Sequence, residues 1–348
     1  MELFLGVDVG TKAIKATILN EDGAIVESSN VPIYHLVERP EASWAQRSAP
    51  QIWEHVKKGL SQLRACSEIQ AVCLDATSGT IVPIDSDGDP LYEFLMYSDE
   101  RSIKEAQELR RKSARAREFE VYLPIAPYLA IPKIMWLRRN IDFSKVQKVL
   151  HESDFISYKL TGQICTSSNV AGKSHADLKG DRYVEEIYED VKIDVNLLPP
   201  IRSIGEVVGT VSGQASEETG LPEGVPVING LTDGSSGDIA TGTLTPGQAN
   251  ATIGTTLILH AVVENPVPDF KRRFYYKTYF VDSFLAGGAT NAGTLPLDAI
   301  AQLLRLSITE LNELARSVPP GCNGLIAQPQ WVGTRVPESY PHVKGFFA

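Results

Sequence analysis

The sequence has little cysteine and no long apolar run. Its 348 residues include only four cysteines, none of them in a Cys-x-x-Cys pair. This excludes a disulfide scaffold and a zinc ribbon, and it fits a reducing cytosol. No apolar run approaches the ~20 residues of a membrane-spanning helix, and the first residues lack the basic start of a signal peptide. We therefore expect a cytoplasmic protein with no membrane partner.

Clustered positive charge is also missing. Lysine and arginine number 33 against 43 aspartates and glutamates, a formal net charge of −10. A nucleic-acid binder usually carries a basic face, so no nucleic-acid partner is expected. The six histidines are scattered, which argues against a zinc-type cluster. The 43% hydrophobic and 22% charged residues are typical of a globular protein, and the length predicts about two domains.

The best-known nucleotide and hydrolase motifs are absent. The segment from Gly6 to Lys12 has one residue too few for a P-loop. Gly172-Lys173-Ser174 could end one, but Ser167 stands where its first glycine is needed. No GxGxxG follows a strand, and neither GxSxG nor HExxH occurs. The sequence therefore predicts none of the functions that these motifs carry.

Apolar periodicity predicts an α/β chain with two domains. Strands are expected over 3–7, 13–19, 24–28, 69–74, 80–84, 225–228, 249–254, 256–262 and 274–280. Helices are expected from residue 49, and over 128–139, 152–160, 291–304 and 308–317, the last with a Ser307/Glu310 capping box. The charged stretch 100–118 favours a solvated helix, and 196–225 weak strands. We expect residues 230–238 to form a loop whose last residues hold the boundary between domains 1–236 and 237–348.

The loop after the first strand suits phosphate and metal. Asp8 at a strand end could hold Mg²⁺, directly or through water. Gly10 and Thr11 offer backbone N–H and hydroxyl donors to phosphate oxygens, and Lys12 or Lys15 adds positive charge. An ordinary β-turn with a surface Asp and Lys remains an alternative interpretation.

Two later loops have similar chemistry. Asp233 follows a buried strand among small residues, where a carboxylate could accept a hydroxyl proton during attack on phosphorus. Gly254, Thr255 and Thr256 suit a second phosphate clamp, and this strand–turn–strand unit at 248–262 echoes that at 3–19. A flexible interdomain linker and a plain hairpin turn are the respective alternatives.

Taken together, these loops resemble the FGGY family of carbohydrate kinases along nearly the whole chain. The order and spacing of several segments carry the resemblance. They are the phosphate motif at 8–11, Trp44 with Trp53, Tyr97–Arg101, Lys133–Leu137, Asp154–Gly162, Ser168–Ala171, Asp233, Gly254–Thr256, and Gly333–Pro337 with Lys344-Gly345. Some positions depart from the family pattern, with Gln46 for Glu, Tyr97 for Trp, Thr334 for Glu and Lys344 for Arg.

The resemblance implies an actin-like ATPase (ribonuclease H-like) α/β fold of two domains with a cleft. It implies ATP-dependent phosphorylation of a sugar hydroxyl with Mg²⁺, and Asp233 as catalytic base. The segment Asp75–Thr80 is similar to the branch that acts on ribulose and related ketopentoses. By that likeness a ketopentose such as D-ribulose or D-xylulose would contact Thr77, Ser78, Asp99, Arg101 and Asp233.

One departure affects the expected activity. The family's glycine-rich adenosine-binding segment lies beyond the region of Lys344-Gly345, and this sequence shows none before Ala348. The second domain is therefore expected to be incomplete. The expected partner is a second copy or a completing chain. The alternatives are a truncated or broken gene product, a catalytically incomplete sugar-binding or regulatory protein, a split kinase completed by another chain, or a general actin-like ATPase or assembly module. The sugar-site segments count against the last.

Overall fold

The computed structural model describes residues 2–254, 257–280, 282–290, 292–331 and 343–348. The chain divides into two compact units. The first comprises Met1–Glu120, Ile125–Gly237 and Lys277–Asp282, and the second Val121–Pro124, Asp238–Tyr276 and Ser283–Ala348. Among the helices described, none is long and apolar enough to cross a membrane.

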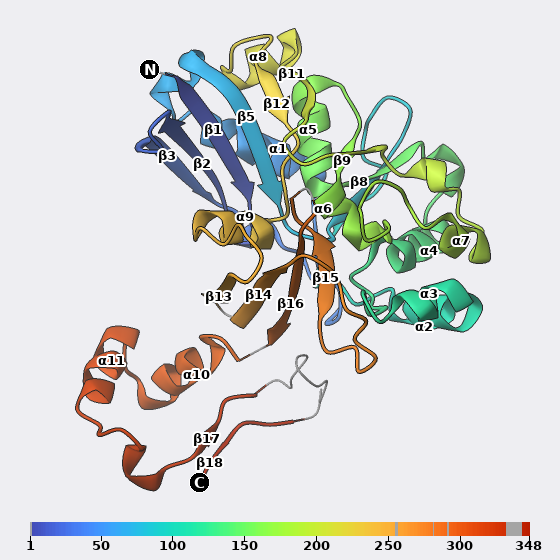
Figure 1. Ribbon diagram of the computed structural model, residues 1–348. Coiled ribbons are helices and arrows are strands. Elements are labelled where there is room, and N and C mark those ends of the chain that lie inside the picture. The colour runs from blue at the N-terminus through green and yellow to red at the C-terminus, as the bar shows by residue number, and fades with distance from the viewer. Residues whose placement is uncertain (1, 255–256, 281, 291, 332–342) are drawn as a thin grey trace. The chain divides into compact units, whose positions relative to one another are not determined.

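A six-stranded mixed sheet organises the first unit (Figure 1). Its strands, in spatial order, are β11 (Val207–Thr210), β12 (Pro226–Ile228), β5 (Ile69–Ala76), β1 (Leu3–Val9), β2 (Ala13–Asn20) and β3 (Ile25–Pro32). β1, β5 and β12 run parallel, whereas β2 and β3 return antiparallel across tight turns. The predicted strand–turn–strand opening is confirmed, and β3 runs further than expected.

Strand alternation leaves one face of this sheet uncovered. In β1, Leu3, Leu5 and Val7 are buried, while Phe4 is exposed on the opposite face. The period of two sends apolar side chains into the core and Asp8 to the open face. Helices α1 (Ala49–Leu60), α5 (Glu152–Thr161) and α8 (Gly213–Thr219) provide the packing: α1 lies on β2 and β3, and α5 on β5, β11 and β12.

A second, four-stranded sheet completes the first unit. Its order is β4 (Gln46–Arg47), β7 (Phe94–Leu95), β6 (Ile81–Ile84) and β8 (Lys148–His151). The remaining elements are α2 (Ile103–Lys112), α3 (Ala114–Phe119), α4 (Ala130–Asn140), α6 (Ser168–Ala171), α7 (Glu185–Asp190) and the strand pair β9 (Thr166–Ser167) and β10 (Ile201–Arg202). The charged stretch 100–118 is helical as predicted, but it breaks at Ser113 and buries Leu109 and Ala116, so it is not simply a solvated face.

The second unit contains a sheet in the order β13 (Ala249–Ile253), β14 (Leu257–Val263), β16 (Phe284–Thr290) and β15 (Tyr275–Thr278), the last shared with residues of the first unit. Helices α10 (Leu295–Leu304) and α11 (Ile308–Arg316) follow, then β17 (Ala327–Gln328) and β18 (Phe346–Phe347). The capping box of Ser307 and Glu310 is confirmed at the start of α11. Strand β16 was not expected from the sequence.

The structure corrects two expectations about loops. Residues 233–240, expected to be mostly loop, form helix α9 (Asp233–Ala240), and α8 lies within the stretch where weak strands were expected. Glycine and serine are poor helix formers, so tertiary contacts must override their propensity in α9. Such contacts are present, because the buried side chain of Asn169 bonds both Thr232 and Ser235.

Gly230 allows the chain to pass close to β5 before it enters α9. A Cβ at this position would lie 1.9 Å from the carbonyl oxygen of Leu74. We expect Gly230→Ala to lower the free energy of unfolding by at least the ~1–3 kcal/mol of an overpacked core. Gly237→Ala is the matched control, since its Cβ would meet nothing within 4 Å. There we expect a gain of up to about 1 kcal/mol from helix propensity. Urea denaturation of both variants checks this, and equal stabilities would contradict it.

Candidate functional site

Two carboxylates lie side by side at the carboxyl end of the central sheet. Asp8 on β1 and Asp75 on β5 are partners in the parallel register, and both fall on the open face of the sheet. One oxygen of Asp8 lies 3.3 Å from Lys15 Nζ on β2. The other, Oδ1, is buried without a hydrogen-bond partner in the described chain, as is Oδ1 of Asp75. Burial is the largest cause that raises the pKa of Asp75, and the neighbouring charge of Asp8 adds to it.

A third carboxylate, Asp233, begins α9 next to this pair. A parallel bridge between Ala76 and Thr232 fixes the chain at this point. Burial raises the pKa of Asp233, the charge of Asp8 raises it further, and the nearby Lys277 ammonium lowers it. Lys277 is itself buried and donates to Thr232 Oγ1 at 3.1 Å. Carboxyl ends of neighbouring parallel strands are where ligands bind in sheets of this kind.

Asn169 fixes the start of α9. It is fully buried in α6. Its Oδ1 accepts from the Thr232 amide at 3.0 Å, and its Nδ2 donates to Ser235 Oγ at 3.2 Å and to the Thr278 carbonyl at 2.6 Å. A buried amide with all these bonds has one orientation, so the direction in which Asp233 leaves the sheet is set.

The turn between β1 and β2 holds the residues that the sequence predicts for phosphate binding. The Gly10 amide donates to the Ala13 carbonyl at 3.1 Å, and the Thr11 hydroxyl donates to Tyr97 Oη at 3.3 Å. The side chains of Lys12 and Lys15 are exposed. The described residues include no group of three or more His, Cys, Asp or Glu close enough to hold a metal. The unpartnered oxygens of Asp8 and Asp75 nevertheless fit the oxygen ligands that Mg²⁺ prefers.

The loop after β5 presents one free hydroxyl. Ser78 Oγ is buried and has no hydrogen-bond partner within the described ranges. The hydroxyl of Thr77 is already used, because it bonds Glu152 Oε2 at 2.7 Å and Thr80 Oγ1 at 2.6 Å. Gly79 has φ +88°, and a Cβ there would lie 2.8 Å from the Tyr128 carbonyl, so the loop requires glycine. The arrangement leaves Ser78 as the member of this loop with an unused polar atom.

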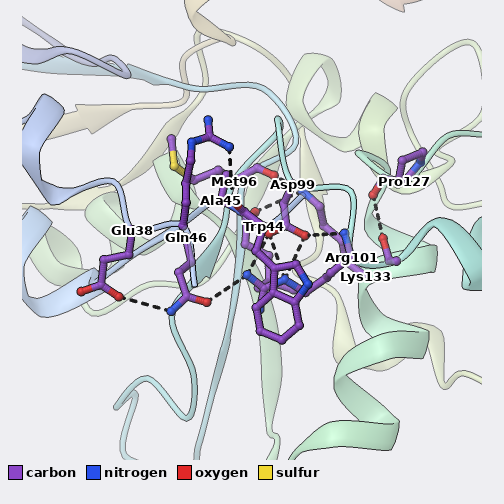
Figure 2. Close-up of polar contacts among 12 residues, drawn as sticks. Glu38, Trp44, Ala45, Gln46, Met96, Asp99, Arg101, Pro127 and Lys133 are labelled. Carbon is purple, nitrogen blue, oxygen red and sulfur yellow. Dashed lines mark hydrogen bonds and ion pairs between the residues drawn. The ribbon is translucent and has the colours of Figure 1, made fainter. Parts of the chain in front are cut away.

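Asp99 and Arg101 form a buried ion pair next to Trp44 (Figure 2). Both side chains are fully buried and lie 2.8 Å apart between Nη2 and Oδ2. The guanidinium lies 3.9 Å from the ring centre of Trp44 and 4.9 Å from that of Trp136, and it donates to Gln46 Oε1 at 2.9 Å. Asp99 also accepts from the Ala45 amide. The polar atoms of this pair are therefore engaged within the protein.

Lys133 connects the loop after β5 to the end of β7 through buried hydrogen bonds. Its side chain is fully buried in α4. Its Nζ donates to the carbonyls of Gly79, Leu95 and Met96 at 2.7, 3.1 and 2.8 Å. Burial lowers the pKa of Lys133 to about 7, against the opposing charge of Asp99. One ammonium thus joins the loop after β5 to the end of β7.

The residues predicted for the site fall into three groups. The first unit contains the residues around Asp8 and Asp233 and, in the loop after β5 and beyond, those around Ser78. Gly254 belongs to the second unit, in the turn after β13. Thr255 and Thr256 lie outside the described residues, as does the segment 333–337.

Sequence reasoning missed several polar residues at this site. Asp75 was noted as the end of a strand, but its pairing with Asp8 needs the sheet register. Lys277 was overlooked, although a lysine within a buried aromatic strand was a usable signal. Arg47 and Glu152, which form a buried ion pair, had no local signal at all.

The sheet order and the acidic residues at its carboxyl end are those of a protein with the actin-like ATPase fold. The structure is similar to a ligand-bound xylulose kinase from Lactobacillus acidophilus, with a TM-score of 0.90 and 21% identity, over 100% of this chain and 72% of that one. A glycerol kinase with ADP from Plasmodium falciparum has a TM-score of 0.88 at 18% identity, over 100% of this chain and 72% of that one. These likenesses support the predicted fold.

Sequence comparison specifies the family. Residues 3–240 match the N-terminal domain of the FGGY family of carbohydrate kinases. A xylulose kinase from Lactococcus lactis is 26% identical over 100% of this chain and 71% of its own length. A gluconokinase from Bacillus subtilis is 24% identical over 99% of this chain and 70% of its own length. The chain belongs to the FGGY family of carbohydrate kinases and is a phosphotransferase, and enzymes of this family generally use ATP and Mg²⁺.

Proposed function

We propose that this protein transfers the γ-phosphoryl group of ATP to a hydroxyl of a ketopentose such as D-ribulose or D-xylulose. The observation that carries the proposal is the set of Asp8, Asp75 and Asp233 at the carboxyl ends of neighbouring parallel strands. The xylulose kinases among its relatives favour a ketopentose, while the gluconokinase keeps the sugar acids in the test panel.

In this proposal Asp233 takes the proton of the attacking hydroxyl. The group is partly buried, and its raised pKa makes it a better proton acceptor than an exposed aspartate. In phosphoryl transfer most of the rate comes from positioning and charge stabilisation. Ser78 Oγ, which lacks a partner, would bond the sugar directly. Thr77, Asp99 and Arg101, whose polar atoms are engaged, would hold the wall against which the sugar lies.

The phosphate end of the proposed site lies at the turn after β1. The backbone amide and hydroxyl of Thr11 would bond phosphate oxygens, with positive charge from Lys12 and Lys15. Gly10, whose own amide is bonded to the Ala13 carbonyl, would shape the turn. Asp8 and Asp75 would hold Mg²⁺ through their free oxygens, directly or through water. Mg²⁺ held there would supply positive charge to stabilise the negative charge that develops on the transferred phosphoryl group.

We also propose that the two domains bind different ligands. Residues 1–236 would bind the sugar, and residues from 237 onwards would belong to the nucleotide-binding domain, where Gly254, Thr255 and Thr256 would clamp phosphate. A second copy of this chain, or another chain that supplies the expected adenosine-binding segment, would associate with the second domain. Gel filtration with light scattering tests the homodimer directly.

ADP release with MgATP and a panel of ketopentoses, polyols, glycerol and gluconate tests the activity. We expect ADP formation that depends on a ketopentose and vanishes when Mg²⁺ is chelated. Turnover with gluconate or glycerol alone would replace the ketopentose assignment. Sugar binding by calorimetry with no ADP from any member would favour the non-catalytic sugar-binding alternative.

A further inference from the structure

A buried chain of polar side chains joins the turn after β1 to the loop after β5. At one end, Arg47 Nη1 donates to the Gly10 carbonyl at 2.8 Å. Arg47 Nη2 lies 2.5 Å from Glu152 Oε1, and both side chains are completely excluded from solvent. At the other end, Glu152 Oε2 accepts from Thr77 Oγ1 at 2.7 Å. All four residues belong to the first unit.

Rigid elements hold both members of this ion pair. Arg47 lies in β4, which is hydrogen-bonded to β7, and Glu152 is the first residue of α5. The Glu152 amide also donates to the Thr80 carbonyl at 3.1 Å. The loop after β5 is therefore attached to Glu152 by a side-chain bond and by a backbone bond.

The buried ion pair of Arg47 and Glu152 is not explained by a contribution to the stability of the fold. Apolar residues of similar volume are often as stable as a buried ion pair or more so, because of the desolvation penalty. An ion pair in a low-dielectric interior is, however, electrostatically strong, and breaking it leaves a buried charge unpaired. Since each end of this link binds a different ligand loop, neither loop can shift without disturbing the pair.

We propose that Arg47 and Glu152 are positioning residues that couple the turn after β1 to the loop after β5, so that sugar and phosphate donor strengthen each other's binding. The inference rests on the proposed function, because it takes the loop at 77–80 as the sugar side and the turn at 10–12 as the phosphate side. It adds a thermodynamic link between them, which is reciprocal by necessity.

The first test is calorimetry on Glu152→Gln, which keeps the shape and an acceptor for Thr77 but removes the charge facing Arg47. The dissociation constant of D-ribulose or D-xylulose is measured with and without a non-hydrolysable MgATP analogue. In the parent we expect the dissociation constant without the analogue to exceed that with it by about 5–150-fold, the usual range for coupled sites. In the variant this ratio falls toward one, while the affinity for sugar alone changes far less. A merely structural role would weaken both affinities and leave the ratio unchanged.

Glu120→Gln is the matched control for this experiment. Glu120 is also fully buried and paired with an arginine, Arg110, but it lies outside the chain from Gly10 to Thr77. We expect it to keep the parent ratio. A parent ratio of one, or a ratio that Glu152→Gln leaves unaltered, overturns the coupling.

The second test needs no ligand and decides the physical link even if Glu152→Gln does not fold. Thr77→Val removes the hydroxyl that bonds Glu152 while keeping the volume. We expect faster hydrogen exchange in the peptide that contains the Gly10–Ala13 turn. Ser78→Ala changes the same loop at a hydroxyl without a partner in the described chain, and exchange in that turn should stay as in the parent.

The outcomes of the two tests distinguish a failure of the proposed coupling from a failure of the proposed function. Unchanged exchange at the turn in Thr77→Val overturns the link. If neither ligand binds the parent protein, the proposed function fails, and the exchange experiment still decides whether Arg47 and Glu152 join the loops.

Discussion

We expect Asp233→Asn to lower kcat by about 10²–10⁴-fold, the usual contribution of a general base, with little change in the KM for the sugar. The amide keeps the size and the bond from the Gly234 amide, which lies 2.7 Å from Asp233 Oδ1, but it cannot take a proton from the attacking hydroxyl. Steady-state ADP release measures the effect. Asp190→Asn, an exposed aspartate at the end of α7, is the control and should behave like the parent.

The same role predicts the acid side of the pH profile. Burial raises the pKa of Asp233. As the pH is lowered, this carboxylate therefore becomes protonated, and unable to act as a base, before an ordinary aspartate with a pKa near 3.9 does. Activity should therefore fall, as pH decreases, before an exposed aspartate would be protonated. If Asp233→Asn retained turnover within a few-fold of the parent, Asp233 would not be the base.

The second large effect is expected on stability, from Lys133→Met. The change removes the donor of three hydrogen bonds to the carbonyls of Gly79, Leu95 and Met96. A buried acceptor left without a partner costs about 1–3 kcal/mol, and Met96 keeps a second donor in the Asp99 amide. We expect a loss of roughly 3 kcal/mol in the free energy of unfolding near pH 7, since part of this cost is offset by the relief of a buried charge.

The pH dependence of this loss has a definite sign. Burial lowers the pKa of Lys133 from the ordinary 10.5 to about 7. Between these values the unfolded chain holds the proton and the folded chain does not, so the free energy of unfolding contributed by Lys133 rises with pH. The gap between parent and Lys133→Met should therefore widen from pH 7 to pH 9.

Urea denaturation at several pH values measures this gap. Lys104→Met, at an exposed position in α2, should leave both the stability and its pH slope unchanged. A constant gap across the range would mean that Lys133 stays charged in the folded protein. Because Lys133 holds Gly79, the variant should also raise the KM for the sugar.

Much of the first unit could be predicted from the sequence, because short-range patterns encode it. The alternation of Leu3, Leu5 and Val7 with polar or small residues fixes β1 and its buried face. The acidic turn at Glu21–Gly23 reverses the chain between β2 and β3. These features depend on neighbours along the chain, so local pattern and turn chemistry suffice.

Helix α9 shows where local reasoning stops. The segment from Asp233 to Gly237 contains two glycines and two serines, a composition that favours a loop. It is helical because Asn169, far away in the sequence, fixes Thr232 and Ser235. Propensity is a weak prior that tertiary contacts override, and no window on the sequence contains both partners.

The sequence by itself determined the family, the α/β fold class and the strand-end position of Asp8. Ordered short motifs and the period of two carry that information along the chain. Only the tertiary structure decided that Asp75 stands beside Asp8, that Asp99 and Arg101 bond each other, and that Arg47 meets Glu152. The reason is physical: sheet register and burial bring together residues distant in the sequence, and such pairing leaves no periodic signal in either segment.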